Sequence, residues 1–319
     1  MVKKVLFIGL GSIGLRHLQN LITINPDLDV GALRSGQGNN IKSCEFVDFE
    51  FNNISDAKEF EPEIVFITNP TSLHIDMALE FVNKVSGIFI EKPISDNIED
   101  AQKLVDNAKN GIIHVACPLR FHPVINFVKK YIEDENDVLN VRIFSGSYLP
   151  SWRPNIDYRA CYSAKMELGG GVSLDLIHEV DFLRWIFGDI KEGYFSSSKV
   201  SDLDIEVEDF AHALLKLETG AICELHLDYF RKIPKRELEI TTKDGVIFAD
   251  ILNSEVLVCK SNENNKINYD FDRNKMYLDE LKYFLECISY NKNSSNDSYF
   301  ASETLKYALY MRNNAGVVK

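Results

Sequence analysis

The stretch VLFIGLGSIG at residues 5–14 joins an apolar run to three glycines with the spacing GxGxxG. The apolar run predicts a buried β-strand, and the segment LRHLQNLITI (15–24) that follows has the periodicity of a helix. In a strand–turn–helix of this kind, Gly9 permits a tight turn, Gly11 lets a pyrophosphate approach the backbone, and Gly14 allows close packing of helix on strand. The helix N-terminus offers N–H groups and partial positive charge to the phosphates. The stretch therefore predicts a dinucleotide-binding loop.

The backbone of Ser12 and Ile13 completes this predicted loop, and the next strand, LDVGALR (28–34), bears on which dinucleotide it binds. An NAD site usually has Asp or Glu at the end of that strand to bind the ribose hydroxyls. Here the strand ends in Arg34 and Ser35. These side chains can neutralise and hydrogen-bond a 2′-phosphate, so NADP is favoured as the cofactor and NAD stays possible. The alternative is that Arg34 is only a solvated loop residue.

The rest of the first third continues the alternation of apolar strands and helices. Three further strands are predicted, EIVFIT (63–68), GIFIEKP (87–93) and IIHVAC (112–117). A helix is expected over about 72–83, and another starts near Asp96 as N-cap, with Glu99 three residues on. Strands that are apolar at every position are buried on both faces of a parallel sheet. We therefore predict an α/β fold that begins with a doubly wound Rossmann domain over residues 1–118.

Beyond residue 118 the predicted strands become longer and alternate more loosely between apolar and polar residues. They lie at residues 137–149, 210–218, 221–230, 236–251 and 255–260, and two helices follow at 276–288 and 302–314. This pattern predicts a second α/β domain over residues 119–319 with an open, predominantly antiparallel sheet. The C-terminal helix could pack back on the first domain.

Composition narrows the classes of function. The net charge is −13 and no lysine–arginine run interrupts it, which argues against a nucleic-acid partner. Six scattered cysteines without metal-type spacing suit free thiols in a reducing compartment. The N-terminal apolar run is far shorter than the ~20 residues that a membrane span needs. We therefore expect a soluble cytoplasmic protein with no membrane anchor.

Three more segments give the chain a specific resemblance. NPTSLH (69–74) follows the third strong strand, EKP (91–93) follows the next, and Gly-Gly-Gly (169–171) precedes Asp175 and His178. Together with GLGSIG, and in this order, they resemble the Gfo/Idh/MocA family over essentially the whole chain. The resemblance implies hydride transfer between a nicotinamide and a carbon of a sugar, an amino or acidic sugar, or a cyclitol. It also implies a homodimer or homotetramer formed through the C-terminal sheet.

The resemblance also implies roles for individual residues. Lys92 matches the lysine that contacts the reacting oxygen, and Asp175 and His178 match an aspartate and a histidine on a helix of the substrate domain. Near the cofactor it places Asn69, Pro70, His74, Glu91 and Pro93. The family's commoner pattern separates the aspartate and the histidine by four residues, whereas here the separation is three. Either spacing predicts two side chains on one face of a single helix.

The predicted acid/base is His178, because an unperturbed imidazole titrates near neutrality. Lys92 is the second choice and, as an ammonium, would stabilise the developing alkoxide; a water or a tyrosine is the remaining option. A metal site built from Asp175, His178 and Glu179 lacks a further ligand, so no metal is expected. His17, on the first helix, is expected to be structural.

Five further residues are predicted to contact the substrate: Arg120, His122, Arg153, Tyr158 and Arg159. The arginines suit a carboxylate or phosphate on the sugar, although surface salt bridges in an acidic protein are equally open for each. The segments GSYLPSWRP (146–154) and DYRACYSA (157–164) resemble a subgroup associated with bacterial surface-sugar pathways. Two other functions stay open on this fold: a redox-assisted lyase or glycosidase that keeps its cofactor, and a non-catalytic sensor. A sensor would not need to keep both Lys92 and His178.

Overall fold

The computed structural model describes residues 2–34, 45–134, 137–261 and 263–319. By its internal contacts the chain divides into two compact units, each described by itself below. The first unit consists of Met1–Cys117 and Asn274–Glu303, and the second of Pro118–Arg273 and Thr304–Lys319.

The first unit contains a six-stranded sheet in the order β3-β2-β1-β4-β5-β6, in which all neighbours are parallel. Its strands are β1 (Lys4–Ile8), β2 (Asp29–Leu33), β3 (Phe49–Phe51), β4 (Ile64–Ile67), β5 (Gly87–Ile90) and β6 (Ile112–Val115). The chain order reverses between β1 and β4, which makes this the switch point where doubly wound sheets bind ligands. The predicted Rossmann sheet is confirmed.

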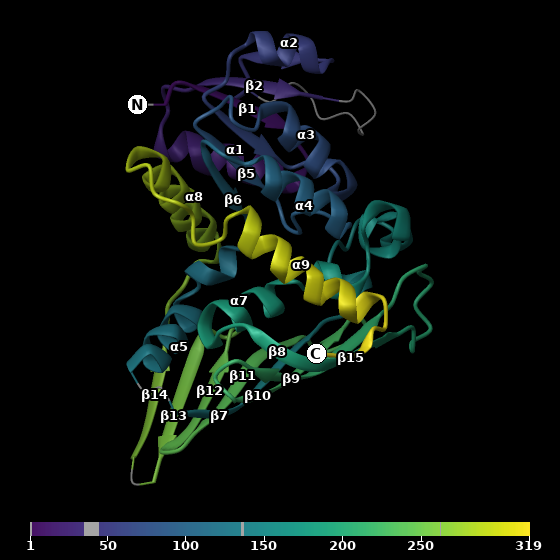
Figure 1. The fold of residues 1–319 in the computed structure, drawn as a ribbon, viewed down its shortest axis with the longest axis vertical. Helices are drawn as coiled ribbons and strands as arrows, with labels where there is room; N and C mark the ends of the chain where they lie inside the picture. Colours follow the sequence, from purple (N-terminus) through teal and green to yellow (C-terminus); the bar gives the residue numbers. More distant parts are fainter. Residues whose placement is uncertain (1, 35–44, 135–136, 262) are drawn as a thin grey trace. The chain divides into compact units, whose positions relative to one another are not determined.

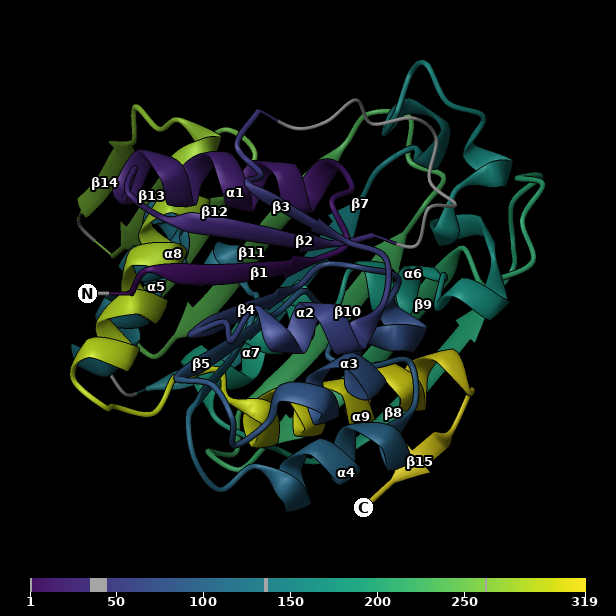
Figure 2. The same cartoon turned by 90° about the horizontal axis from the view of Figure 1, so that it is seen from above.

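Helices cover both faces of this sheet. They are α1 (Ser12–Ile24), α2 (Ile54–Glu59), α3 (His74–Phe81), α4 (Ile98–Asn107) and α8 (Arg273–Ser289). Leu18 of α1 and Phe284 of α8 share one buried cluster with Phe7 and Phe66 of the sheet, so these two helices pack on one face. Figure 2 shows α1 on one side of β1 and β2, with α2 and α3 on the other. The core of the first unit is thus a three-layer sandwich.

The start of α4 differs from the prediction. Asp96 was the predicted N-cap, but the N-cap is Asn97, whose side chain accepts a hydrogen bond from the backbone N–H of Asp100 at 3.0 Å. The carbonyl oxygen of an asparagine satisfies a first-turn N–H as well as a carboxylate does. The capping box that was built on Asp96 is therefore wrong by one residue.

The second unit contains a nine-stranded mixed sheet in the order β14-β13-β12-β11-β7-β10-β9-β8-β15. Its strands are β7 (Val138–Gly146), β8 (Ile190–Ser198), β9 (Phe210–Leu217), β10 (Ile222–Asp228), β11 (Lys235–Thr242), β12 (Gly245–Asp250), β13 (Glu255–Lys260), β14 (Glu263–Asn268) and β15 (Gly316–Val318). Only β7 and β10 among these neighbours are parallel, so the expected open, predominantly antiparallel sheet is confirmed.

One face of this second sheet carries the helices of its unit, α5 (Pro123–Asp134), α6 (Val172–Asp175), α7 (His178–Phe187) and most of α9 (Ser298–Arg312). Figure 1 shows α5, α7 and α9 along that face. Val141, Leu215 and Leu225 are buried beneath them. No helix of the described residues lies on the opposite face, where Leu214 and Phe248 are exposed.

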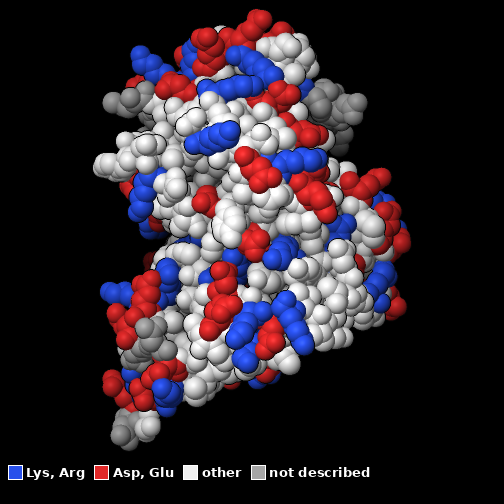
Figure 3. Space-filling view, in the orientation of Figure 1, with Lys and Arg blue, Asp and Glu red and all other residues white. Residues whose placement is uncertain are grey.

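The charge distribution and the apolar character of the helices complete the description. On the face drawn in Figure 3, acidic and basic side chains are intermixed over the described residues, without a continuous basic area. In the part of the chain that the structure describes, no helix combines the length and the apolar character needed to cross a bilayer.

Candidate active site

The glycines after β1 pack the loop closely against the end of β4. Gly9 has a φ of +88°, and a Cβ placed there would lie 2.8 Å from the backbone N and Cα of Asn69. A Cβ on Gly14 would lie 2.6 Å from Oγ1 of Thr68. Side chains at these two positions would force the turn away from the sheet, which is the packing that the motif predicts.

Gly11 differs from its two partners because the space beside it is open. A Cβ there would meet no atom of the described residues within 4 Å. Gly11 is the N-cap of α1, no side chain of the described residues caps the helix, and its first turn has no acidic residue. The first-turn N–H groups, including those of Ser12 and Ile13, therefore have no intrahelical acceptor and no side-chain acceptor in the part of the chain that the structure describes. Oδ1 of Asn69 is also buried without a hydrogen-bond partner among the described residues. An open approach to uncapped N–H groups fits the pyrophosphate of a dinucleotide.

Replacing Gly11 with valine should abolish tight cofactor binding without unfolding the first unit. The new side chain finds room in the free protein but occupies the space of the phosphates. Each lost hydrogen bond to a charged group costs about 1.5–3 kcal/mol, so the affinity should fall by about ten- to a hundredfold per bond. Calorimetric titration with NADPH and NADH, together with a thermal melt, measures both effects.

Gly14→Val is the matched control for that variant. Its Cβ collides with Thr68, so both the melting temperature and the cofactor affinity should fall. Equal losses of stability in the two variants would contradict the assignment of the open space at Gly11 to phosphates.

Arg34 follows β2, at the position expected to select the dinucleotide. Its Nη1 lies 2.8 Å from Oε1 of Glu50 in β3, and the pair is partly exposed. Exposed ion pairs are worth little, so a phosphate can compete with Glu50 for the guanidinium. Ser35 lies outside the described residues.

Asn69 and Pro70 follow β4, and the segment 91–93 follows β5, whose strand ends at Ile90 instead of continuing through the segment as predicted. His74, at the start of α3, is buried behind these loops. Its Nδ1 and Nε2 lie 2.9 Å from the backbone oxygens of Pro93 and Asn69. Burial lowers the pKa of His74 despite these two hydrogen bonds. Any effect of His74 on a cofactor is thus exerted through the position of the loops.

Glu91 is paired with His17, which was expected from the sequence to be a structural residue. Its Oε1 lies 2.6 Å from Nε2 of His17 on α1, and both residues are buried. Burial by itself raises the pKa of Glu91, but the His17 hydrogen bond and the neighbouring charges, including that of Lys92, outweigh it and lower the pKa below its usual range. Lys92 itself is partly exposed, and its peptide bond to Pro93 is cis.

In the second unit, the residues 174–181 do not form the single helix that was predicted. Helix α6 ends at Asp175, residues 176 and 177 form a turn, and α7 begins at His178. The argument that Asp175 and His178 share one helical face is therefore wrong. Their relative direction is set by this break and not by helical spacing.

The acidic residues around His178 are each bonded to partners within the second unit. Arg236 donates to both oxygens of Glu179, at 2.6 and 3.0 Å. Arg120 donates to both oxygens of Asp181, at 2.7 Å each. His178 is the only residue from 171 to 184 that is not buried. The polar cluster thus resolves into fixed carboxylates around one partly exposed imidazole.

Asp175 is held by a tyrosine far away in the sequence. The Tyr229 hydroxyl donates to its Oδ2 at 2.6 Å, and both residues are buried. Burial, followed by the charge of Asp175, raises the pKa of Tyr229. The same carboxylate raises the pKa of Tyr162. Both phenols therefore stay protonated. This arrangement suits a positioning role for Asp175.

Gly171, the last of the three glycines before α6, packs against a second residue that the sequence did not indicate, Glu208. A Cβ on Gly171 would lie 2.6 Å from the carboxylate oxygens of Glu208, and one of these oxygens accepts from the backbone N–H of Ser173 at 3.1 Å. Glu208 thus satisfies an N–H at the start of the helix that carries Asp175. Neither Glu208 nor Tyr229 has a local sequence signal, because each acts across more than thirty residues.

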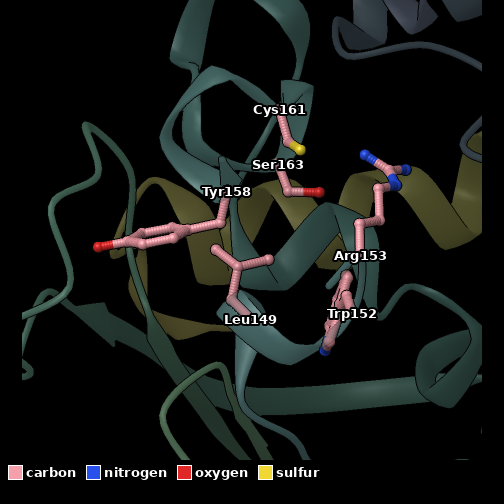
Figure 4. A pocket seen from close by; sticks show the side chains of 6 residues that line it. All are labelled: Leu149, Trp152, Arg153, Tyr158, Cys161 and Ser163. Atoms are coloured by element: carbon pink, nitrogen blue, oxygen red, sulfur yellow. The ribbon is translucent and has the colours of Figure 1, made fainter. Parts of the chain in front are cut away.

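Two of the predicted substrate residues, Arg153 and Tyr158, line a small cavity of the second unit (Figure 4). Its other lining residues are Leu149, Trp152, Cys161 and Ser163. Its volume is about 10 Å³, which is room for a single water. Oγ of Ser163 is buried there without a hydrogen-bond partner among the described residues. This cavity is too small for a sugar.

The other predicted substrate residues have structural partners. Arg120 is enclosed and bonded to Asp181, as described above. Arg159 is paired with Asp157, at 2.8 Å between Nη2 and Oδ2. His122 is buried against Phe271, and burial, followed by the charges of two arginines, lowers its pKa to about 4. Burial does not favour a substrate role for Arg120 and His122, whereas Arg159 and its ion pair are exposed. The substrate role of all three residues stays a prediction.

Within the described part of the chain, no group of three or more His, Cys, Asp or Glu residues has an arrangement that could hold a metal ion.

A Rossmann sheet with an open phosphate loop, followed by a mixed-sheet unit, defines a class of dinucleotide-binding proteins. The model of an oxidoreductase family with an NAD-binding Rossmann fold, Gfo/Idh/MocA, matches residues 3–115, and the C-terminal domain model of the same family matches residues 129–248. The chain belongs to the Gfo/Idh/MocA oxidoreductase family.

Similar proteins agree with this placement. A myo-inositol 2-dehydrogenase from Thermotoga maritima is 25 % identical, over 95 % of this chain and 92 % of its own length. An uncharacterized oxidoreductase from Bacillus subtilis is 27 % identical, over 70 % of this chain and 66 % of its own. A solved levoglucosan dehydrogenase in complex with NADH and levoglucosan has a TM-score of 0.84 at 17 % identity, covering 99 % of this chain and 98 % of that one, which shows a shared fold.

Proposed function

We propose that this protein is an NAD(P)-dependent dehydrogenase that acts on a hydroxyl-bearing carbon of a sugar, an amino or acidic sugar, or a cyclitol. The observation that carries the proposal is the phosphate loop, in which Gly11 leaves open space beside the uncapped N-terminus of α1. Membership of the family supplies the class of reaction. The names of its relatives, which act on inositol and levoglucosan, supply the class of substrate.

The bound nicotinamide would supply the hydride acceptor or donor. The first unit would hold the dinucleotide through the loop at residues 9–14, through Arg34 and Ser35, and through the loops at 69–74 and 91–93. The second unit would bind the substrate and carry the oligomer contacts. The assignment of the cofactor to the first unit and of the substrate to the second follows the family resemblance.

We assign the transfer of the substrate's hydroxyl proton to His178. In the direction of oxidation, its imidazole removes the hydroxyl proton of the substrate while the ammonium of Lys92 hydrogen-bonds the same oxygen and stabilises its developing negative charge. Asp175, held by Tyr229, orients the substrate or His178. In the direction of reduction the same groups return the proton.

We favour NADP over NAD because Arg34 stands where an NAD site has a carboxylate. We expect NADPH to bind more tightly than NADH to the wild-type protein. Arg34→Ala should weaken NADPH by about ten- to a hundredfold, the cost of hydrogen bonds to a charged group, and leave NADH unchanged. Fluorescence titration of each reduced cofactor makes the comparison.

Glu50→Gln is the matched control for that substitution, because it releases the guanidinium from its ion pair and should leave NADPH binding intact or stronger. Tighter binding of NADH than of NADPH to the wild-type protein would reject the NADP preference without affecting the dehydrogenase proposal.

The uncovered face of the nine-stranded sheet supports self-association. Phe248, Leu214 and Tyr194 are exposed on it. Between them, Arg142 and Glu224 form an ion pair at 3.0 Å. A sheet face that mixes exposed apolar side chains with charged pairs suits a contact with a second copy, so we infer a homodimer or homotetramer through this face. The described cysteines are free thiols, in keeping with a cytoplasmic location.

A further inference from the structure

The buried pair of His17 and Glu91 adjoins Lys92, whose backbone N–H donates to Oε2 of Glu91 at 3.2 Å. His17 is fully enclosed, and its ring packs edge-on against Phe89 of β5 and Tyr277 of α8, with centroid distances of 4.9 and 6.0 Å. Its Nε2 lies 2.6 Å from Oε1 of Glu91. The ring is therefore fixed in place with one nitrogen against the carboxylate.

The two ring nitrogens of His17 have different surroundings. A carboxylate only accepts hydrogen bonds, so Nε2 of His17 carries the hydrogen. Nδ1 is buried and has no hydrogen-bond partner among the described residues. A hydrogen on Nδ1 as well would be a buried donor without an acceptor, which is unfavourable. The pair therefore has one ring nitrogen of His17 against the Glu91 carboxylate and the other enclosed without an acceptor among the described residues.

Several groups keep Glu91 ionised. The titratable groups facing Glu91 are His17, Lys92 and His74. Burial raises the pKa of Glu91, but the His17 hydrogen bond and the neighbouring positive charge lower it below the ordinary value. Oε2 also accepts from the backbone N–H of Lys92 at 3.2 Å. The carboxylate therefore persists at neutral pH.

Glu91 follows the carboxyl end of β5, and this position bears on its distance from the cofactor. In a doubly wound sheet the dinucleotide crosses the carboxyl ends of the strands at the switch point, with one mononucleotide half on each side. The phosphate loop and Arg34 belong to the half formed by β1 and β2. The nicotinamide half therefore belongs to the ends of β4 and β5, and Glu91 follows β5 directly. An oxidised nicotinamide ring is positively charged, whereas a reduced ring is neutral.

We propose that the Glu91 carboxylate sets the relative affinity for the oxidised and reduced forms of the cofactor, and that His17 is the positioning residue that keeps Glu91 ionised and fixed. This inference rests on the proposed function, because it needs a nicotinamide cofactor on the first unit. It assigns His17 a task in the reaction, where the sequence indicated only a structural one.

The test measures binding and needs no substrate. Dissociation constants for NADP⁺ and NADPH are determined by calorimetry for the wild-type protein and for Glu91→Gln. Loss of a negative charge near the ring should weaken the oxidised form relative to the reduced form by about tenfold. Lys92→Met is the matched control, because removing the neighbouring positive charge should shift the same ratio in the opposite direction.

The role of His17 is tested by the pH dependence of that ratio. His17→Phe removes the hydrogen bond that keeps the pKa of Glu91 low, so Glu91 should take up a proton at a higher pH than in the wild-type protein. As the pH falls through this raised pKa, NADP⁺ should bind more weakly relative to NADPH, until the ratio of the two dissociation constants reaches the Glu91→Gln value. The wild-type ratio should return as the pH rises. His17→Gln keeps an N–H donor and should restore the flat profile of the wild-type protein.

The outcomes are distinguishable. Wild-type protein that binds neither form would overturn the proposed function and this inference with it. Normal binding of both forms by Glu91→Gln, with an unchanged ratio, would overturn the inference alone. If His17→Phe does not fold, His17→Met, which also lacks a hydrogen-bond donor, takes its place: an affinity for NADP⁺ that falls relative to NADPH as the pH is lowered supports the inference, and a flat wild-type profile overturns the positioning role.

Discussion

Replacing His178 with asparagine should lower kcat on an identified substrate by about 10²- to 10⁴-fold, the contribution of a positioned acid/base. His178 is the one side chain between residues 171 and 184 that reaches the surface of its unit. Asparagine keeps a polar side chain of smaller size but cannot take up the proton. The substitution therefore removes proton transfer and leaves the buried carboxylates around it bonded as before.

Two further measurements separate catalysis from general damage in this variant. The dissociation constant for NADPH should be unchanged, because the cofactor is assigned to the other unit. The limb of the pH profile of kcat/KM that depends on the free acid/base should disappear. Full turnover by His178→Asn would reject the assignment and shift the proton to Lys92, the second candidate.

Replacing Arg120 with methionine should destabilise the second unit by about 3–5 kcal/mol, the cost of leaving one member of a buried ion pair without its partner. Both Arg120 and Asp181 are buried, and the guanidinium meets both carboxylate oxygens at 2.7 Å. The two tryptophans, Trp152 and Trp185, both lie in the second unit, so denaturation followed by their fluorescence reports on this unit specifically.

The double variant Arg120→Met with Asp181→Leu is the matched control. It replaces the pair by apolar side chains, which is often neutral or even stabilising, so most of the lost stability should return. If Arg120→Met kept its stability and instead raised KM, the guanidinium would serve the substrate, as the sequence pattern suggested.

The first unit was largely predictable because its physics is local. Central strands of a parallel sheet are buried on both faces and read as unbroken apolar runs, and the glycine spacing marks the turn that follows β1. The short strand Phe49–Phe51 was missed because three residues carry no periodicity. The edge strand Glu263–Asn268 was missed because it is polar and exposed, as edge strands commonly are.

The partners of the site residues were not predictable, because each joins segments far apart in the chain. His17 and Glu91 are 74 positions apart, Arg236 and Glu179 are 57 apart, and Tyr229 and Asp175 are 54 apart. A single sequence has no local signal for such pairs. The break between α6 and α7 was missed for a related reason: the local pattern favours a continuous helix, and tertiary packing overrides propensity.

The most direct test of the central claim is a turnover measurement on the purified protein. The protein is incubated with NADP⁺ or NAD⁺ and each member of a panel of sugars, acidic and amino sugars and cyclitols, while the absorbance band of the reduced nicotinamide is followed. We predict that at least one member produces reduced cofactor in an amount equal to the oxidised product, and that His178→Asn removes this signal. Conversion of a sugar without net formation of reduced cofactor would contradict the dehydrogenase assignment and indicate a redox-assisted lyase or glycosidase instead.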